Sequence, residues 1–111
     1  MSLPIRLSSW FEQDVSRQTE WYLARAGAAV ALAFGVKVDA TLERIEKFPE
    51  SGIERKYPVP ELAGLRFLPV DEPYGRFLVF YRVFANELSI ERLIHGVRDL
   101  SRRLLDPPGV E

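Results

Sequence analysis

With 111 residues, the chain is long enough for one domain built around a single hydrophobic core. The apolar fraction of 47% is typical of a globular fold, and the absence of cysteine excludes disulfides and thiolate metal sites. A formal net charge of −1 lacks the basic excess of most proteins that bind nucleic acid through phosphates, and therefore favours a protein partner. We expect a cytoplasmic protein, since neither a signal peptide nor a membrane-spanning stretch is visible.

The first elements predicted along the chain are a strand and a helix. Ile5 and Leu7 alternate with polar neighbours, as in a short strand with one buried face. Ser9 and Glu12 have the spacing of a capping box, in which each side chain bonds the free backbone N–H of the other. This pattern predicts a helix that begins at Ser9 and ends near Gly27, a residue suited to the left-handed position after a helix.

A second helix is predicted from about Ala28 to Pro49. Its apolar stripe recurs at helical spacing and comprises Val30, Phe34, Val38, Leu42, Ile45 and Phe48. Gly35 lies inside this helix, at a cost of about 1 kcal/mol relative to Ala. Because so few residues separate the two helices, we expect an antiparallel helical hairpin.

The second half of the chain predicts a small sheet. Residues 53–64 are polar and contain two prolines, so they are read as a loop. The strands are predicted at 65–70, 76–84 and 88–95, and a short basic helix or arm at 97–105. The order β-α-α-β-β-β-α predicts an α+β domain with the hairpin packed on a small antiparallel sheet. Residues 1–105 form the domain, and we expect 106–111 to be a disordered tail.

Side-chain alternation along the central strand predicts a surface for a partner. One face is apolar throughout and is assigned to the helices: Phe77, Val79, Tyr81 and Val83. A single hairpin covers one face of a small sheet, so the opposite face is expected to bind a partner. The predicted partner surface comprises Arg76, Leu78, Phe80, Arg82, Leu93 and His95. The alternative is that the C-terminal arm folds back over this face and completes the core.

Five segments, taken in order, carry a family likeness. They are Phe48-Pro49-Glu50-Ser51-Gly52, Leu65-Arg66, Leu68-Pro69-Val70, Phe80-Tyr81-Arg82-Val83 and Ile94-His95-Gly96-Val97-Arg98-Asp99. Together with the order of elements, these segments resemble the RelE/ParE superfamily of bacterial toxins, and the resemblance covers the chain up to Leu105. It implies the toxin of a type II toxin–antitoxin pair, which a labile antitoxin holds inactive by wrapping it with a C-terminal segment.

The superfamily has two activities, and the resemblance implies one of them. RelE-like members are ribosome-dependent mRNA endonucleases, whereas ParE-like members poison DNA gyrase. The nuclease pattern carries basic residues where this chain has Leu68 and Leu78. The resemblance therefore implies the ParE-like (plasmid stabilisation) branch, with gyrase as the target and no catalytic residue. Tyr81 is expected in the core, with its hydroxyl bonded at the edge.

Two alternatives stay open. The first is a metal-independent, ribosome-dependent endonuclease that uses Arg66, Arg98 and His95, because an imidazole suits acid–base work. The second is an inactive scaffold that binds only antitoxin. The candidates for binding the target are Arg98, Arg102 and Arg103. No cofactor, metal or membrane partner is expected, since one His and no Cys leave only scattered carboxylates as metal ligands. Contact with DNA is expected only through the antitoxin.

Overall fold

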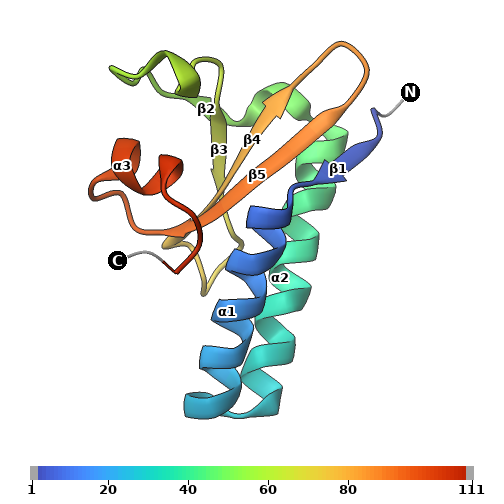
Figure 1. Ribbon diagram of the computed structural model, residues 1–111. Helices are drawn as coiled ribbons and strands as arrows, with labels where there is room; N and C mark the ends of the chain where they lie inside the picture. Colours follow the sequence, from blue (N-terminus) through green and yellow to red (C-terminus); the bar gives the residue numbers. More distant parts are fainter. Residues whose placement is uncertain (1–2, 110–111) are drawn as a thin grey trace.

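The computed structural model describes residues 3–109 and has two long helices beside a five-stranded sheet (Figure 1). The helices are α1 (Ser9–Ala26), α2 (Ala28–Lys47) and the short α3 (Leu100–Leu105). The strands are β1 (Ile5–Leu7), β2 (Ile53–Glu54), β3 (Arg66–Pro69), β4 (Phe77–Val83) and β5 (Leu88–His95). Single 3-10 turns lie at Pro49–Ser51 (η1) and Pro60–Leu62 (η2). The α+β class and the helical hairpin are confirmed.

The strand order in the sheet is β1-β5-β4-β3-β2. β2 through β5 are antiparallel, but β1 pairs parallel to β5, with Ile5 opposite Leu88. The sheet is therefore mixed, whereas the sequence predicted only antiparallel pairing. Parallel pairing is possible here because the whole hairpin and the other strands lie between β1 and β5 in the chain. The sequence also missed β2, which has only two residues.

The start of α1 differs from the prediction. Ser8, and not Ser9, is the N-cap, and its Oγ accepts a hydrogen bond from the backbone N–H of Phe11 at 3.0 Å. The Oγ of Ser8 also donates to the backbone carbonyl of Glu91 in β5, at 2.8 Å. Ser8 thus starts the helix and also fixes its first turn to the sheet. The expected end is confirmed at Gly27, whose φ of +93° is a conformation that favours glycine.

The hairpin packs on one face of the sheet and forms the larger apolar core. Its fully buried members include Phe34, Ile45, Val79, Tyr81, Leu88 and Ile90. The hydroxyl of Tyr81 donates to the carbonyl of Pro49 at 2.7 Å and accepts from the N–H of Gly52 at 2.9 Å. Burial raises the pKa of Tyr81, although the Gly52 N–H and Arg66 act in the other direction. The expectation of a core tyrosine bonded through its hydroxyl is confirmed.

The opposite face of the sheet is covered too, so the expectation of an open face is wrong. Leu78 is 5% exposed and Phe80 is fully buried. They pack in a second apolar cluster with Leu62 of η2, Leu65 just after it, Ile94 of β5, and Leu100 and Leu104 of α3. Figure 1 places α3 across the sheet from the hairpin. The C-terminal arm therefore completes the core, as the alternative interpretation stated, and residues 57–65 contribute the rest.

A bulge in β5 changes the faces of its second half. Phe80 pairs with Arg92 and Tyr81 with Ile90, which leaves Glu91 as one extra residue. Before the bulge, Leu88 and Ile90 face the helices. After it, Leu93 and His95 lie on the helix side, and Ile94 joins the second cluster. The prediction that Leu93 and His95 lie on the partner face is therefore wrong.

None of the helices within residues 3–109 combines the length and apolar character needed to cross a bilayer.

Candidate functional site

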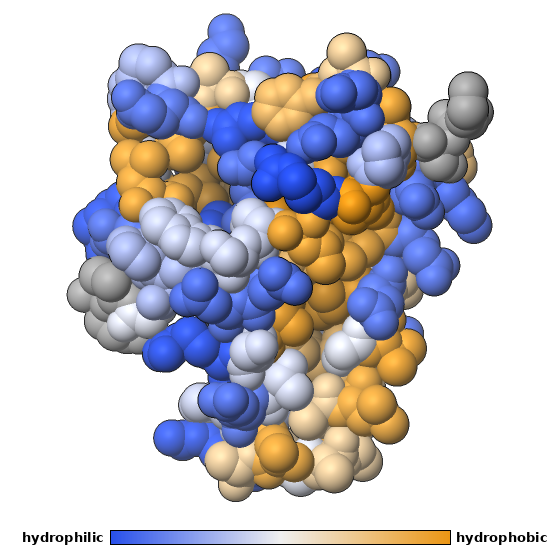
Figure 2. All heavy atoms as spheres, turned by 45° about the vertical axis from the view of Figure 1, so that its right-hand side comes forward, coloured by the Kyte–Doolittle hydropathy of each residue, from blue (hydrophilic) through white to orange (hydrophobic). Residues whose placement is uncertain are grey.

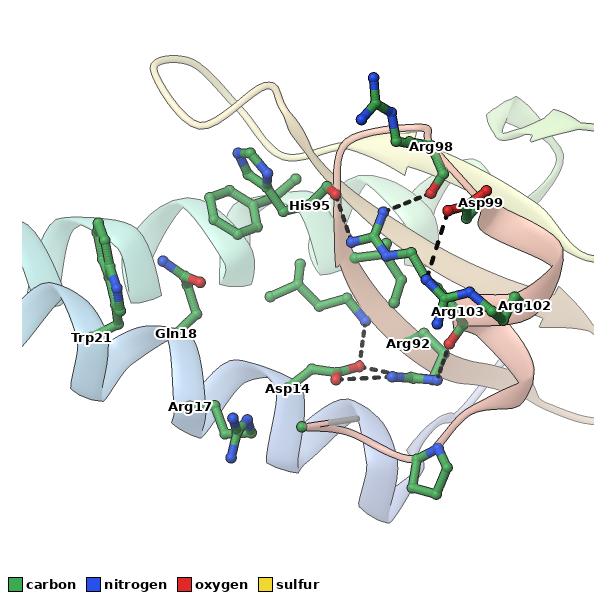
Figure 3. A pocket seen from close by; sticks show the side chains of 15 residues that line it. Asp14, Arg17, Gln18, Trp21, Arg92, His95, Arg98, Asp99, Arg102 and Arg103 are labelled. Atoms are coloured by element: carbon green, nitrogen blue, oxygen red, sulfur yellow. Dashed lines mark hydrogen bonds and ion pairs between the residues drawn. The ribbon is translucent and has the colours of Figure 1, made fainter. Parts of the chain in front are cut away.

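An open pocket of about 500 Å³ lies where the end of β5 meets α1 and the C-terminal segment (Figure 3). Its lining is rich in arginine and includes Arg17, Arg92, Arg98, Arg102 and Arg103. The rest of the lining includes Asp14, Trp21, Phe77, His95 and Asp99. We call this site the basic pocket. It draws on residues from both ends of the chain.

One nearly buried ion pair holds the back of the basic pocket. Arg92 donates from Nε to Oδ2 of Asp14 at 2.8 Å and from Nη2 to Oδ1 at 3.1 Å. The backbone N–H of Leu93 also donates to Asp14 Oδ2, at 2.9 Å. Beyond the short β1, no strand within residues 3–109 pairs with this edge of β5, so the Asp14 carboxylate satisfies an edge donor. The pair fixes α1 to β5, as Figure 3 shows.

Arg92 and Arg103 then hold the C-terminal segment over the pocket. Nη1 of Arg92 donates to the carbonyls of Arg103, Leu104 and Asp106, at 3.0, 3.2 and 2.7 Å. The guanidinium of Arg103 donates two hydrogen bonds to the turn after β5, to the carbonyls of Arg98 at 3.0 Å and His95 at 2.7 Å. These two arginines are structural, since backbone oxygens occupy much of their donor capacity.

The basic side chains of the pocket that face solvent are those of Arg17, Arg98, Arg102 and His95. Arg102 is shared between Asp106 at 3.2 Å and Asp99 at 3.7 Å. Neither Arg17 nor Arg98 forms an ion pair with another residue in the range 3–109. The imidazole of His95 is exposed and meets the Phe77 ring edge to face, with ring centroids 4.8 Å apart.

The charge balance of the basic pocket is positive. Its lining has five arginines against two aspartates, a net of three positive charges with His95 neutral. Asp14 is committed to Arg92, and an incoming anion would compete with Asp99 and Asp106 for Arg102. Arginine forks bind carboxylate or phosphate through two parallel hydrogen bonds. The arrangement suits an anionic group of a partner, with Trp21, 49% exposed, beside it.

Comparisons with known proteins agree with the fold and name the family. A family model described as "ParE toxin of type II toxin-antitoxin system, parDE" matches residues 5–100. The chain belongs to this ParE toxin family. The solved structure titled "Chromosomal ParDE TA system from P. aeruginosa" has the same fold, with a TM-score of 0.70 and 19% sequence identity. The match covers 86% of this chain and 97% of that chain. No curated protein sequence matches the chain.

The basic pocket brings together the residues predicted to bind the target. Arg98, Arg102 and Arg103 all line it, together with His95. Sequence reasoning missed the contribution of α1, which comes from Asp14, Arg17 and Trp21. The only signal for it was the i, i+3, i+4, i+7 spacing of Asp14, Arg17, Gln18 and Trp21, which places them on one side of the helix.

The structure separates the alternative nuclease residues of this ParE family member. Arg66 pairs with Tyr81 across β3 and β4, whereas His95 pairs with Phe77 across β4 and β5. The two sites are thus four residues apart along β4, about 13 Å, with the width of a strand between them. Arg66 is also occupied, because its Nη1 donates to the carbonyl of Gly52 at 3.0 Å. Arg98 and His95 share the basic pocket, and Arg66 does not.

The six residues predicted to bind a partner have different environments. Leu78, Phe80 and Leu93 are buried. Arg82 is half-buried, paired with Glu91 at 2.8 Å and bonded to the carbonyls of Glu61 and Ala63. Only Arg76 and His95 are exposed, and both lie at the basic-pocket end of the sheet, where the N–H of Gly96 donates to the carbonyl of Arg76 at 2.7 Å.

Two further expectations concern the tail and metal ions. Within residues 3–109, no group of three or more His, Asp or Glu side chains is placed to hold a metal ion. Residues 107–109 lie beside α1, where Pro107 and Gly109 line the basic pocket and the guanidinium of Arg17 approaches Gly109. The end of the predicted tail, residues 110–111, lies outside the described part of the chain.

Proposed function

We propose that this ParE family member is a cytoplasmic toxin that inhibits DNA gyrase by protein contact, and that its cognate antitoxin holds it inactive. The observation that carries the proposal is the composition of the basic pocket. Exposed Arg17, Arg98 and Arg102 surround His95 and are held by a buried ion-pair frame. A rigid cluster of arginine forks is suited to the carboxylates of a protein surface.

The positions of the candidate nuclease residues support a toxin that acts without catalysis. Cleavage of RNA without a metal needs a base and an acid beside a phosphate-binding cation. Arg66 lies far from His95 and is bonded to backbone carbonyls. Tyr81 is buried, and burial raises its pKa, which makes it a poor base. We therefore propose no catalytic residue.

The antitoxin is proposed to bind at the same end of the molecule. Arg76 and His95 are the exposed members of the predicted partner surface, and His95 belongs to the basic pocket. An acidic antitoxin segment that orders on binding would lie across Arg76 and the pocket arginines. The antitoxin then blocks the surface that the toxin needs for its target, so that neutralisation follows from competition.

A ribosome-dependent endonuclease is the second candidate, and one observation favours it. His95 is exposed beside Arg98 and Arg102, so an acid–base group and phosphate-binding cations share one pocket without Arg66. This reading uses the same residues as the gyrase proposal. The two proposals differ in the target and in the expected effect of substituting His95. A nuclease needs the imidazole for proton transfer, whereas a binding surface does not.

The decisive experiment measures growth and target activity with matched variants. We expect arrest when the chain is expressed without antitoxin, and loss of DNA supercoiling by purified gyrase when the toxin is added. Arg98→Ala should weaken inhibition about tenfold or more, whereas Arg55→Ala, an exposed arginine outside the pocket with the same charge change, should not. Codon-linked mRNA cuts with translating ribosomes, abolished by His95→Ala, would instead establish the nuclease. A lack of growth arrest would identify an inactive scaffold.

A further inference from the structure

Trp21 stands at one end of the basic pocket and belongs to neither apolar cluster of the fold. The guanidinium of Arg25 lies over the indole, 4.9 Å from the ring centroid, and the ring of Tyr22 meets it edge to face at 5.5 Å. Arg25 follows Trp21 by one helical turn, whereas Gln18 precedes it and lines the pocket. Figure 3 shows Gln18 on the side of the indole that is turned toward Arg98. One face of Trp21 is therefore covered by a cation, and the other is directed into the pocket.

The cations of the basic pocket are concentrated in a small volume. Arg17 and Arg98 form no ion pair within residues 3–109, and the lining as a whole carries three net positive charges with His95 neutral. The volume of about 500 Å³ lies within the range of sites that enclose a small molecule. Such a site is suited to one compact ligand with several negative charges.

The aromatic face and the arginines of α3 lie at opposite ends of the basic pocket. Asp14 marks the α3 end, because it pairs with Arg92, which bonds the carbonyl of Asp106 just after α3. Trp21 comes seven residues after Asp14 on α1, a rise of about 10 Å. Figure 3 places Trp21 and Arg102 on opposite sides of the view. A ligand that uses both ends therefore needs a planar ring and an anionic group joined by a short spacer.

A nucleotide has this design, and a peptide fits it less well. A nucleoside diphosphate carries about three negative charges, because its terminal phosphate bears roughly two and its inner phosphate about one. A peptide would need three separate acidic side chains in the same volume to match that charge. Bases stack on exposed aromatic rings irrespective of sequence, and arginine forks bind phosphate through paired hydrogen bonds. The surface agrees, since the side beside the C-terminus, at the left of Figure 2, is mainly blue and white rather than orange.

We propose that the basic pocket binds a free nucleoside di- or triphosphate. The base stacks on the open face of Trp21, and the phosphates bind Arg17, Arg98 and Arg102. The binding does not depend on gyrase. Its consequence, that a bound nucleotide competes with a protein partner for the same arginines, rests on the function proposed above.

Isothermal titration calorimetry with the purified full chain tests the proposal, with ADP, adenosine and inorganic pyrophosphate as separate probes. ADP should bind at least tenfold more tightly than either half. Trp21→Ala should weaken ADP about tenfold, the usual effect of removing one stacked base, and leave pyrophosphate unchanged. Trp21→Phe should keep most of the affinity, because it keeps an aromatic face. Phe48→Ala, at a 65% exposed aromatic residue outside the pocket, is the control and should change nothing.

The phosphate half of the site has its own pair of variants. Arg98→Ala should weaken ADP and pyrophosphate alike, at least tenfold, whereas the exposed Arg55→Ala should affect neither. Equal affinity for ADP and pyrophosphate would reduce the pocket to a simple anion site and overturn the proposal. Unchanged ADP binding by Trp21→Ala, no binding of ADP at millimolar concentration, or at least tenfold tighter binding of a six-residue oligoadenylate would also overturn it. A chain that binds ADP but leaves gyrase active would contradict only the proposed function.

Discussion

Asp14 and Arg92 are 78 residues apart in the sequence and form a two-point ion pair, with N–O distances of 2.8 and 3.1 Å. Their side chains are only 8% and 6% exposed. The remaining Nη1 of Arg92 reaches the carbonyls at the end of α3. One guanidinium thus joins α1, β5 and α3, the three elements that form the basic pocket.

Asp14→Ala should therefore destabilise the fold strongly, because it leaves the Arg92 cation buried without its partner. We expect the free energy of unfolding to fall by about 3–5 kcal/mol. Urea denaturation followed by circular dichroism measures this loss. The matched control is Glu87→Ala, which breaks the exposed pair with Arg6 and should cost far less, because solvent screens that pair. Equal losses in the two variants would contradict the role given to the buried pair.

Phe80→Glu should prevent folding, because the side chain is fully buried between the sheet and the segments that cover it. An unpaired carboxylate in this cluster carries a large desolvation penalty. The milder Leu78→Ala should cost about 2–5 kcal/mol, as expected for a truncated core leucine. Phe84→Glu is the control at a 45% exposed position, and it should fold normally. A folded Phe80→Glu protein in a thermal melt would show that this face is open.

Tyr81→Phe should destabilise the protein and change its response to alkali. Loss of the hydroxyl leaves the buried N–H of Gly52 without its acceptor, at a cost of about 1–3 kcal/mol. Because burial raises the folded-state pKa of Tyr81, its stabilising contribution is complete below the unfolded pKa, about 10, and is lost as pH rises through the folded value. Urea titrations from pH 8 to 11 should show the gap between wild type and variant closing. A constant gap would contradict this linkage.

Two glycine substitutions should act in opposite directions. Gly35→Ala places a methyl group in open space on α2 and should stabilise the fold by about 1 kcal/mol. Gly52→Ala puts a Cβ 2.3 Å from the Tyr81 hydroxyl, so that contact must shift and stability should fall. Differential scanning calorimetry compares them, and a shift of about 4 °C is expected for each kcal/mol. A lower melting temperature for Gly35→Ala would mean that the fold itself needs this glycine.

Local patterns in the sequence were sufficient to predict most of the helices and strands. Gly27 correctly marked the helix–helix turn, and the predicted bounds of the last strand, 88–95, are those of β5. The faces of β4 followed from alternation and were right as well. Alternation failed in β5 because a bulge arises from the way two strands pair, and no residue type in β5 predicts one.

The candidate site was predicted only in part, for two physical reasons. The basic residues after β5 were identifiable from their clustering in the sequence. The contribution of Asp14 depends on tertiary contact with Arg92, which is distant in the sequence, and the helical spacing of Asp14 with Arg17 and Trp21 could not identify that partner. The cover over Leu78 and Phe80 comes from an irregular segment, residues 57–65, whose apolar side chains are separated by prolines and charges. A loop of this kind has no period from which its buried residues can be inferred.

The extra residue at Glu91 has a consequence for how such a protein could diverge. Loss of that single codon would restore simple alternation in β5 without moving any later side chain to the other face, because Ile90 would still pair with Tyr81 and Arg92 with Phe80. His95 would stay opposite Phe77, and Arg92 would keep its position next to Asp14. The bulge thus lets β5 lose one residue while the basic pocket, the helices and the other strands stay intact.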